Sequence, residues 1–265
     1  MTEKRKFTFE TIGHIENGFK YHYEAPRQAV FAAAGAFLRW DSGEYAAAAE
    51  DLDGFDRIWL IWVFDQNKHS SWRTKVQVPV PAEKDLYSVF ATRSPYRPNP
   101  IGISAVELVE ITREGLQLGP CDLLNGTAVL DIKPYIPEVD AFPDAKAGWR
   151  DNIDKSQWQI TWSEMAAVQA DFILQNGQLD LKNFCFVQLS SRPFDSKRKR
   201  VEFDGNMQMY ILHCRTWQIV FSAGENSVIY IHFIKSNYSD CDLAPDAADP
   251  YNDKNLHRKF NMLFS

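Results

Sequence analysis

The chain is organised around the stretch Phe90-Ala91-Thr92-Arg93-Ser94-Pro95-Tyr96-Arg97-Pro98-Asn99-Pro100-Ile101-Gly102-Ile103-Ser104. Each proline fixes its own φ, lacks a backbone N–H and pushes the preceding residue toward an extended conformation. We therefore expect a rigid loop between two strands that presents Arg93 and Arg97. A guanidinium binds a carboxylate or a phosphate through two parallel hydrogen bonds, so the loop predicts an anion-recognition site. A stiff connector with solvated arginines is the alternative.

Strand-like sequence lies on both sides of this loop. The segment 55–64 is continuously apolar and aromatic, which predicts a strand that is buried on both faces. It stops at Asp65-Gln66-Asn67, which predicts either a ligand site or an ordinary turn. After the loop, residues 103–111 predict a second strand, and Gly115 predicts a hairpin that returns through residues 116–118.

A further strand is predicted at residues 128–135, and it carries three polar candidates. The period of two places Asp131, Lys133 and Tyr135 on one face. An acid, a base and a phenol on one face form a candidate polar site; the alternative is an Asp–Lys ion pair beside a packed tyrosine. Just before this strand, Asn125-Gly126 predicts a tight turn, because both residues tolerate positive φ.

These patterns predict a mainly β fold in two parts. Many short strands between residues 7 and 150, beginning with one around Phe7, Phe9 and Ile12, favour a small closed β-barrel. A change of composition after Trp149 separates a domain at 1–150 from a smaller α+β domain at 151–265. In the second domain we expect a helix at 163–174 capped by Ser163, an ambiguous segment at 183–189, strands at 207–214, 217–222 and 228–234, and a loosely ordered acidic stretch at 240–250.

Charge and cysteine usage restrict the class of protein. The net charge of -6 argues against a generally basic nucleic-acid-binding coat, so RNA contact would need a local patch. The densest patch is Lys197-Arg198-Lys199-Arg200, which is either solvated or in contact with RNA phosphates, with Phe194 as a stacking surface. The four cysteines show no paired spacing and the histidines no metal-ligand spacing, so neither disulfides nor a metal site is expected.

No membrane or secretory segment is expected from the sequence. The longest strongly apolar run, 58–64, is far shorter than the roughly 20 residues that a spanning helix needs. The charged N-terminus has no apolar segment behind it, so it does not predict a signal peptide. Gly-x-Gly-x-x-Gly and Walker A patterns are also absent, so neither a Rossmann nor a P-loop nucleotide site is indicated. We expect a soluble cytoplasmic protein.

The stretch from Ala91 to Ser104 resembles the signature of the TsaA-like (TrmO) family of tRNA methyltransferases. Further blocks match the family in the same order over residues ~7 to ~150. They are Pro26-Arg27-Gln28, the Trp-rich strand that ends at Phe64, the blocks 122–127 and 131–137, and the segment from Asp140 to Trp149. Arg192-Pro193 and the strands after it resemble the family's smaller second domain.

The resemblance implies a homodimeric β-barrel that binds S-adenosylmethionine and methylates N6 of threonylcarbamoyladenosine at position 37 of tRNA, next to the anticodon. It places cofactor contacts on Pro26, Arg27, Gln28, Asp65, Gln66, Arg93, Ile103, Asp122, Leu123, Leu124 and Asn125. Two positions depart from the family pattern: Asp65 replaces a frequent His, and Asn125 replaces a frequent Asp. Both changes alter the charge offered to the cofactor, and the Asp65 contact is the less secure of the two.

The implied reaction assigns roles to the remaining candidates. The N6 atom belongs to a urea, so loss of its proton would help it attack, and Asp131 or Tyr135 could be the general base. Lys133 could offset developing negative charge or hold the threonyl carboxylate, and Arg97 is a second candidate for that carboxylate. The predicted substrate side consists of Arg97, Asn99, Arg192, Lys197, Arg198, Lys199 and Arg200. A non-catalytic RNA-binding or regulatory module that retains the barrel is the alternative function.

Overall fold

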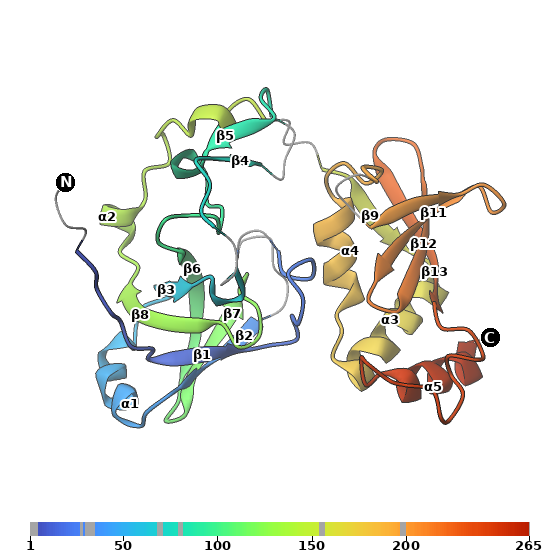
Figure 1. Cartoon of the computed structure of the whole chain (residues 1–265), viewed down its shortest axis with the longest axis horizontal. Coiled ribbons are helices and arrows are strands. Elements are labelled where there is room, and N and C mark those ends of the chain that lie inside the picture. Colours follow the sequence, from blue (N-terminus) through green and yellow to red (C-terminus); the bar gives the residue numbers. More distant parts are fainter. Residues whose placement is uncertain are drawn as a thin grey trace. The chain divides into compact units, whose positions relative to one another are not determined.

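The computed structural model describes residues 5–26, 29, 35–67, 71–78, 82–153, 157–196 and 200–264. The chain divides into two compact units, Met1–Asp154 and Lys155–Ser265, each with its own sheet and core (Figure 1). The first unit is called the barrel unit below, and the other is called the second unit.

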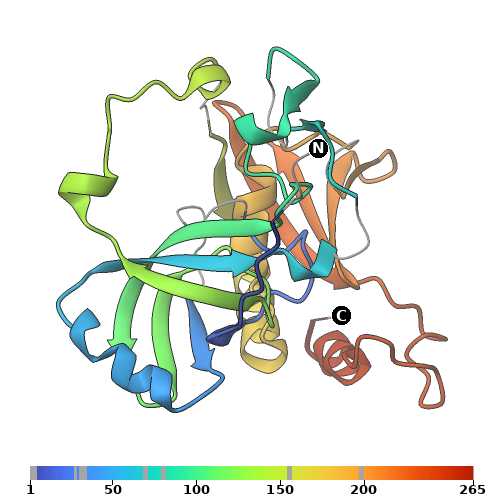
Figure 2. The same ribbon diagram turned by 60° about the vertical axis from the view of Figure 1, so that its left-hand side comes forward.

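The barrel unit is a closed barrel of antiparallel strands in the order β1-β2-β7-β6-β3-β8 (Figures 1 and 2). The strands are β1 Gly13–Glu16, β2 Gly35–Trp40, β3 Arg57–Val63, β6 Ile101–Ile111, β7 Gly115–Pro120 and β8 Ala128–Pro134. Closure removes exposed sheet edges, which would otherwise pair with other chains. The predicted β-barrel is confirmed.

Alternation along β3 shows how the sequence builds the barrel core. Ile58 and Leu60 are fully buried inside the barrel, whereas Trp59 and Ile61 point outward and are half-buried. The expectation that this strand is buried on both faces is therefore only half right. Its outer side is partly covered because the Trp59 indole donates to Asp140 at 3.0 Å. The core is completed by other strands and loops, through Ile15, Leu38, Val106, Leu116, Leu118, Cys121, Leu123 and Val129.

Shorter elements surround the barrel. A helix α1 Glu44–Ala48 and a 3-10 turn η2 Glu50–Leu52 lie between β2 and β3, in an alanine-rich segment with high helix propensity. A small ribbon of β4 Lys75–Gln77 and β5 Leu86–Ser88 precedes the proline-rich loop. The remaining short elements are η3 Asp65–Asn67, η4 Val89–Ala91, α2 Pro137–Asp140 and η5 Gly148–Arg150.

The first-strand prediction in the barrel unit is wrong, whereas the tight turn at Asn125-Gly126 is confirmed with a different backbone conformation. Residues 5–12 form no strand, and Phe7 and Phe9 remain exposed, because the first strand to find barrel partners is β1. At Asn125-Gly126 only Gly126 takes positive φ, at 79°, and Thr127 N–H donates to Leu124 O at 3.1 Å. The turn therefore lies in a loop between β7 and β8, which do not pair with each other.

The second unit has a mixed five-stranded sheet in the order β10-β11-β12-β13-β9, in which β9 runs parallel to β13. Its strands are β9 Gln159–Trp162, β10 Val201–Asp204, β11 Met209–Cys214, β12 Trp217–Ala223 and β13 Val228–Ser236. Its helices are α3 Glu164–Gly177, α4 Leu181–Leu189 and α5 Lys254–Phe264. The Ser163 hydroxyl caps α3 by accepting from Ala166 N–H at 3.0 Å, as predicted.

The C-terminal part is more ordered than the composition predicts. Its acidic stretch is tied to α5, because Lys254 donates to Asp242 O and Arg258 donates to Leu243 O at 2.8 Å. Helix α5 and the strands β9 and β10 were not predicted from the sequence. Within the residues that the structure describes, no helix is long and apolar enough to cross a bilayer.

Candidate cofactor and substrate site

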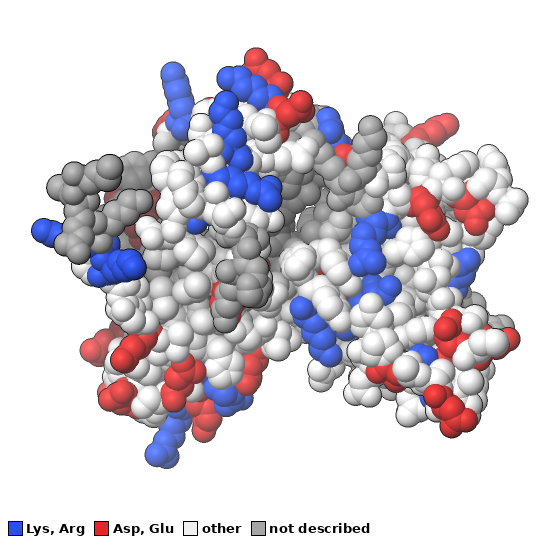
Figure 3. Space-filling view, viewed as in Figure 1, with Lys and Arg blue, Asp and Glu red and all other residues white. Residues whose placement is uncertain are grey.

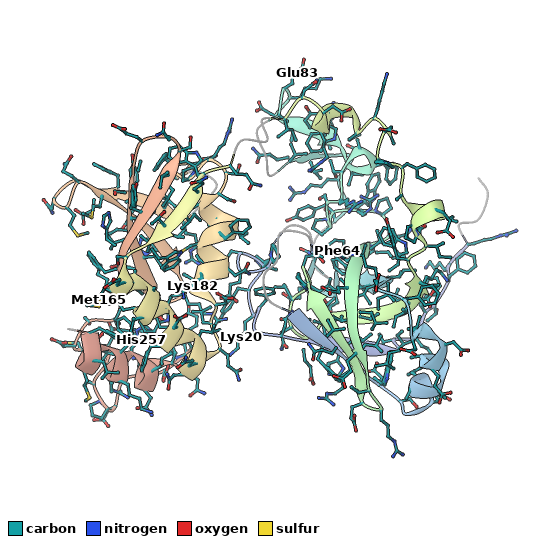
Figure 4. The ribbon with its side chains drawn as sticks, turned by 180° about the vertical axis from the view of Figure 1, so that it is seen from behind. Lys20, Phe64, Glu83, Met165, Lys182 and His257 are labelled. Atoms are coloured by element: carbon teal, nitrogen blue, oxygen red, sulfur yellow. The ribbon has the colours of Figure 1, made fainter. Side chains whose placement is uncertain are left out.

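One end of the barrel gathers the segments that the sequence singles out. Strand β3 ends there beside the start of β6, with Val63 opposite Ile101, and β7 ends beside the start of β2, with Pro120 opposite Gly35. Phe64, labelled in Figure 4, donates its N–H to Pro100 O at 2.8 Å, so the end of β3 is bonded to the proline-rich loop. We call this end the site end of the barrel.

The proline-rich loop is held by one of its own arginines. The Arg97 guanidinium donates from Nη1 to Thr92 O at 2.7 Å and to Val89 O at 3.2 Å, and it stacks over the Phe90 ring at 5.7 Å. The loop therefore owes its shape to Arg97 as well as to its prolines. Arg93 is exposed, so it is the arginine of this loop that can contact a ligand.

A mostly buried carboxylate, Asp122, lies in the loop after β7 at the same end. Burial raises the pKa of Asp122, while the Ser104 hydroxyl and the nearby Arg93 guanidinium act in the opposite direction. Its Oδ1 atom is inaccessible to solvent and has no hydrogen-bond partner among the residues that the structure describes. A buried acceptor without a donor costs free energy, so such an atom points to a ligand that supplies the donor.

A chain of hydrogen bonds supports this carboxylate from inside the barrel. The Trp62 indole N–H donates to Ser104 Oγ at 3.1 Å, and the Ser104 hydroxyl bonds to Asp122. Gly102 faces Trp62 across the β3–β6 pair, and a Cβ at Gly102 would come within 2.3 Å of the indole. A glycine is therefore needed here for the indole to reach Ser104.

The loop that carries Asp122 is anchored by a distant segment. Asn17 donates its amide to Leu123 O at 2.8 Å, and Asn125 Oδ1 accepts from Asn17 N–H at 3.0 Å. Asn125 N–H also donates to Phe19 O at 2.9 Å, and the Leu123 side chain is buried in the core. The side chain of Asn125 thus holds the loop in place, a role that needs an acceptor oxygen and no charge.

The predicted cofactor residues are distributed around the site end. Pro26 is buried, Asp65 and Leu124 are half-buried, and Gln66 is exposed. Ile103 lies on β6 with its side chain outside the barrel and 47% exposed. Arg27 and Gln28 lie outside the described residues.

The three candidates on β8 are only partly brought together. Asp131 and Lys133 share the outer face and form an exposed ion pair of 3.0 Å, and Asp131 lies beside Ile61, whose other neighbour is Ile103. Tyr135 follows the far end of β8, where its N–H donates to Arg57 O at 3.1 Å. Because a strand rises about 3.3 Å per residue, Tyr135 is carried roughly 20 Å away from the site end.

The predicted substrate-side residues fall in both units. Asn99 is exposed in the proline-rich loop of the barrel unit. Arg192 is exposed in the second unit with a positive φ of 47°, and Arg200 accepts there from His213 N–H at 2.8 Å through its backbone oxygen. The segment 197–199 lies outside the described residues.

Sequence reasoning did not single out Trp62, Ser104 or Asn17. The alternation of side chains along β6 could have identified Ser104. If Ile103 points outward, the next residue points into the barrel. The contacts of Trp62 and Asn17 depend on strand register and on loops far apart in the sequence, which no local pattern contains.

The polar groups of the site are complementary to those of S-adenosylmethionine. The orphaned Asp122 Oδ1 needs a donor, and this cofactor has an ammonium group, ribose hydroxyls and an adenine amino group. Arg93 beside Asp122 keeps the surroundings from being purely acidic. Asp122 and Arg93 would hold the cofactor's polar groups.

The fold and site define a closed-barrel protein with a cluster of polar groups at one barrel end. Residues 14–141 match the family model described as tRNA-methyltransferase O N-terminal domain. A tRNA (adenine(37)-N6)-methyltransferase of Escherichia coli K12 is 37% identical over 163 residues, 59% of this chain and 69% of that protein. An S-adenosyl-L-methionine-binding protein of Archaeoglobus fulgidus is 38% identical over 130 residues, 49% of this chain and 89% of that protein.

The structural comparison extends over both units. The crystal structure of TrmO from Pseudomonas aeruginosa matches with a TM-score of 0.64 and 27% identity, covering 88% of this chain and 99% of that chain. The chain belongs to the TrmO, or TsaA-like, family.

Proposed function

We propose that this protein is a cytoplasmic S-adenosylmethionine-dependent methyltransferase that methylates N6 of threonylcarbamoyladenosine at position 37 of tRNA. Family membership and the name of the Escherichia coli relative support the reaction. The observation that carries the proposal is the buried Asp122 Oδ1, a carboxylate oxygen that has no donor among the residues that the structure describes, at the barrel end where the family motifs meet. A carboxylate kept for folding alone would have both oxygens bonded.

In this proposal Asp122 orients the cofactor. Its Oδ1 accepts a hydrogen bond from a cofactor hydroxyl or amino group, and Ser104 and Arg93 keep the carboxylate ionised against the cost of burial. When bound, S-adenosylmethionine supplies a methyl group that is already activated for transfer. The protein therefore contributes alignment more than covalent catalysis, because holding two reactants in line removes much of the entropic barrier.

The proton on N6 is assigned to Asp131. This carboxylate is about half exposed on the outer face of the barrel. It lies in the same cross-strand row as Ile103, with Ile61 between them. It accepts the N6 proton as nitrogen attacks, and Lys133 at 3.0 Å offsets the negative charge that develops on the urea. Arg97 is already bonded to Val89 O and Thr92 O, so we assign it to loop support and leave the threonyl carboxylate to Lys133.

A second candidate is a cofactor-binding RNA module without methyl transfer. The Archaeoglobus fulgidus relative, which bears only the name of a binding protein, favours it, as does the replacement of the frequent family histidine by Asp65. We also propose a homodimer, because Ile101 and Ile103 expose apolar surface near the site end. Sedimentation velocity tests this association: a single monomer boundary over a wide concentration range would exclude it.

The deciding experiment is mass spectrometry of tRNA nucleosides. Purified protein, S-adenosylmethionine and tRNA that carries threonylcarbamoyladenosine should give the N6-methylated nucleoside, and cells that lack the protein should lose it. Calorimetric titration with S-adenosylmethionine separates the two candidates. Cofactor binding without any methylated product would favour the RNA module. Absence of cofactor binding would contradict both candidates, because each assigns cofactor binding to Asp122.

A further inference from the structure

Three arginines of the barrel unit stack on three aromatic rings in one region. Arg73 lies over Tyr96 at 4.5 Å, Arg97 over Phe90 at 5.7 Å and Arg150 over Trp149 at 5.8 Å. The Tyr87 ring packs on Trp149 at 4.8 Å, and Trp72 is 52% exposed next to Arg73. We call these eight side chains the arginine–aromatic surface.

The surface is continuous because its segments are bonded to one another. Arg73 N–H donates to Tyr96 O at 3.1 Å, and Val89 N–H donates to Thr74 O at 3.0 Å, which joins the β4–β5 ribbon to the proline-rich loop. The Trp149 indole donates to Ala91 O at 2.8 Å, which joins the 141–153 segment to the same loop. The three stacks are therefore held in one rigid arrangement by backbone contacts.

The charge of the barrel unit is divided between its two ends. Figure 3 shows Lys and Arg, with some Asp and Glu among them, over the β4–β5 end, and mostly Asp and Glu over the α1 end. Among the described residues at the first end, the exposed bases are Arg73, Lys75, Lys84, Arg93, Lys146 and Arg150, and the exposed acids are Asp85, Asp144, Asp151 and Glu83, which is labelled in Figure 4. The α1 end carries exposed Glu44, Glu50, Asp51 and Asp53. A chain with a net charge of -6 thus keeps a local basic surface.

We infer that the arginine–aromatic surface binds the phosphates and unpaired bases of an RNA loop. A guanidinium held over a ring is already oriented for phosphate oxygens, and Arg73 and Arg150 supply these contacts, whereas Arg97 supports the loop. Exposed Phe90, at 73%, and Trp72 offer ring faces on which unstacked bases can pack. The inference rests on the proposed function, since it names the surface that holds the anticodon loop while its modified base reaches the site end.

Two variants and a matched control test this surface in the whole protein. The double variant R73Q/R150Q removes two guanidinium groups, and W72A removes one exposed ring. R113A is the control, because Arg113 is equally exposed but lies in the β6–β7 turn, away from the surface. The probe is a synthetic anticodon stem-loop RNA, whose binding is followed by fluorescence anisotropy at several salt concentrations.

The expected results separate charge from stacking. R73Q/R150Q should bind the RNA at least about tenfold more weakly, and the slope of log K against log salt should fall by about 1.4, since each single-strand phosphate contact contributes about 0.7. W72A should lose at least about fivefold with an unchanged slope, because stacking does not release counterions. R113A should match the wild type. Calorimetric titration with S-adenosylmethionine should give the same affinity for all four proteins.

Other outcomes overturn the inference or the proposed function separately. Wild-type RNA affinity and salt slope in R73Q/R150Q would refute the surface, whatever the activity. So would a change of sedimentation behaviour in W72A without a change in RNA affinity, which would assign the surface to a second copy of the chain. If the wild type binds RNA through these residues but gives no methylated nucleoside, the inference stands and the proposed function falls.

Discussion

Each unit contains a largely buried aspartate, and the two differ in how completely they are bonded. In the second unit, Asp253 accepts from Thr216 at 2.8 Å with one oxygen and from Tyr238 at 2.9 Å with the other. In the barrel unit, Asp122 keeps an oxygen without a donor among the described residues. We infer from this difference that Asp253 serves folding, and our proposal assigns Asp122 to a ligand.

The surroundings of Asp253 show what a satisfied polar centre looks like. Thr216 donates its only proton to Asp253, so it accepts from His257 Nε2 at 2.8 Å, and His257 Nδ1 then accepts from Ser236 at 2.8 Å. The fully buried His257 ring, labelled in Figure 4, also stacks on Trp217 at 3.7 Å. The network fastens α5 to the loop before β12 and to the end of β13. The polar groups of this network are already bonded to one another, so we assign the network to folding and not to ligand binding.

The largest expected effect comes from replacing Asp122. D122N should weaken S-adenosylmethionine binding by about a hundredfold, or about 2.8 kcal/mol, because an amide is a weaker acceptor than a carboxylate and can present an N–H instead. Its Tm should not fall, since the substitution removes a desolvated charge. Calorimetry of binding and of unfolding measures both. A lowered Tm together with normal cofactor affinity would make Asp122 the structural aspartate and reverse the comparison.

The matching change in the second unit should behave in the opposite way. D253A leaves the Thr216 and Tyr238 hydroxyls without their acceptor, so unfolding of the second unit should become easier by about 2 kcal/mol. Cofactor affinity should stay at the wild-type value. Differential scanning calorimetry of the whole chain, with D246A as the control at an exposed aspartate outside the network, checks this. An unchanged melting profile would show that the network does not stabilise the unit.

Sequence patterns predicted the barrel well because closed antiparallel strands depend on local alternation. The family motif made Asp122 a candidate cofactor contact, and the structure adds that its Oδ1 is buried without a donor among the described residues. They could not predict the position of Tyr135, because a period of two fixes the face of a strand and says nothing of distance from a site. They also missed the support from Asn17 and Ser104, since those contacts come from register and from loops that meet only in the folded chain.

The pH dependence of stability should differ in sign between the two aspartates. Burial raises the pKa of Asp122, so between its ordinary value of 3.8 and the raised value the folded state holds the extra proton, and stability falls as pH rises. For Asp253, burial raises the pKa, but hydrogen bonds from His257, Thr216 and Tyr238 outweigh it and leave it lowered. Stability from Asp253 is therefore present above 3.8 and is lost as pH falls through the lowered value.

Denaturant titrations across the acid range measure these slopes. D122N should remove the part of the profile that declines with rising pH, and D253N should remove the part that rises. Cofactor affinity of the wild type should weaken as pH falls through the raised pKa of Asp122, because a protonated carboxyl is a poorer acceptor. A cofactor affinity that does not change over this range would contradict a role for the ionised carboxylate.

The smallest expected effect concerns the support behind Asp122. S104A removes the hydroxyl that bonds to the carboxylate, so the pKa of Asp122 should rise further and cofactor affinity should fall about fivefold, or about 1 kcal/mol. W62F keeps the ring but removes the indole donor to Ser104, so its loss should be smaller. The pH profile of binding decides the matter. If Ser104 positions Asp122, the midpoint moves to higher pH in S104A, whereas a merely structural serine would lower Tm and leave the midpoint unchanged.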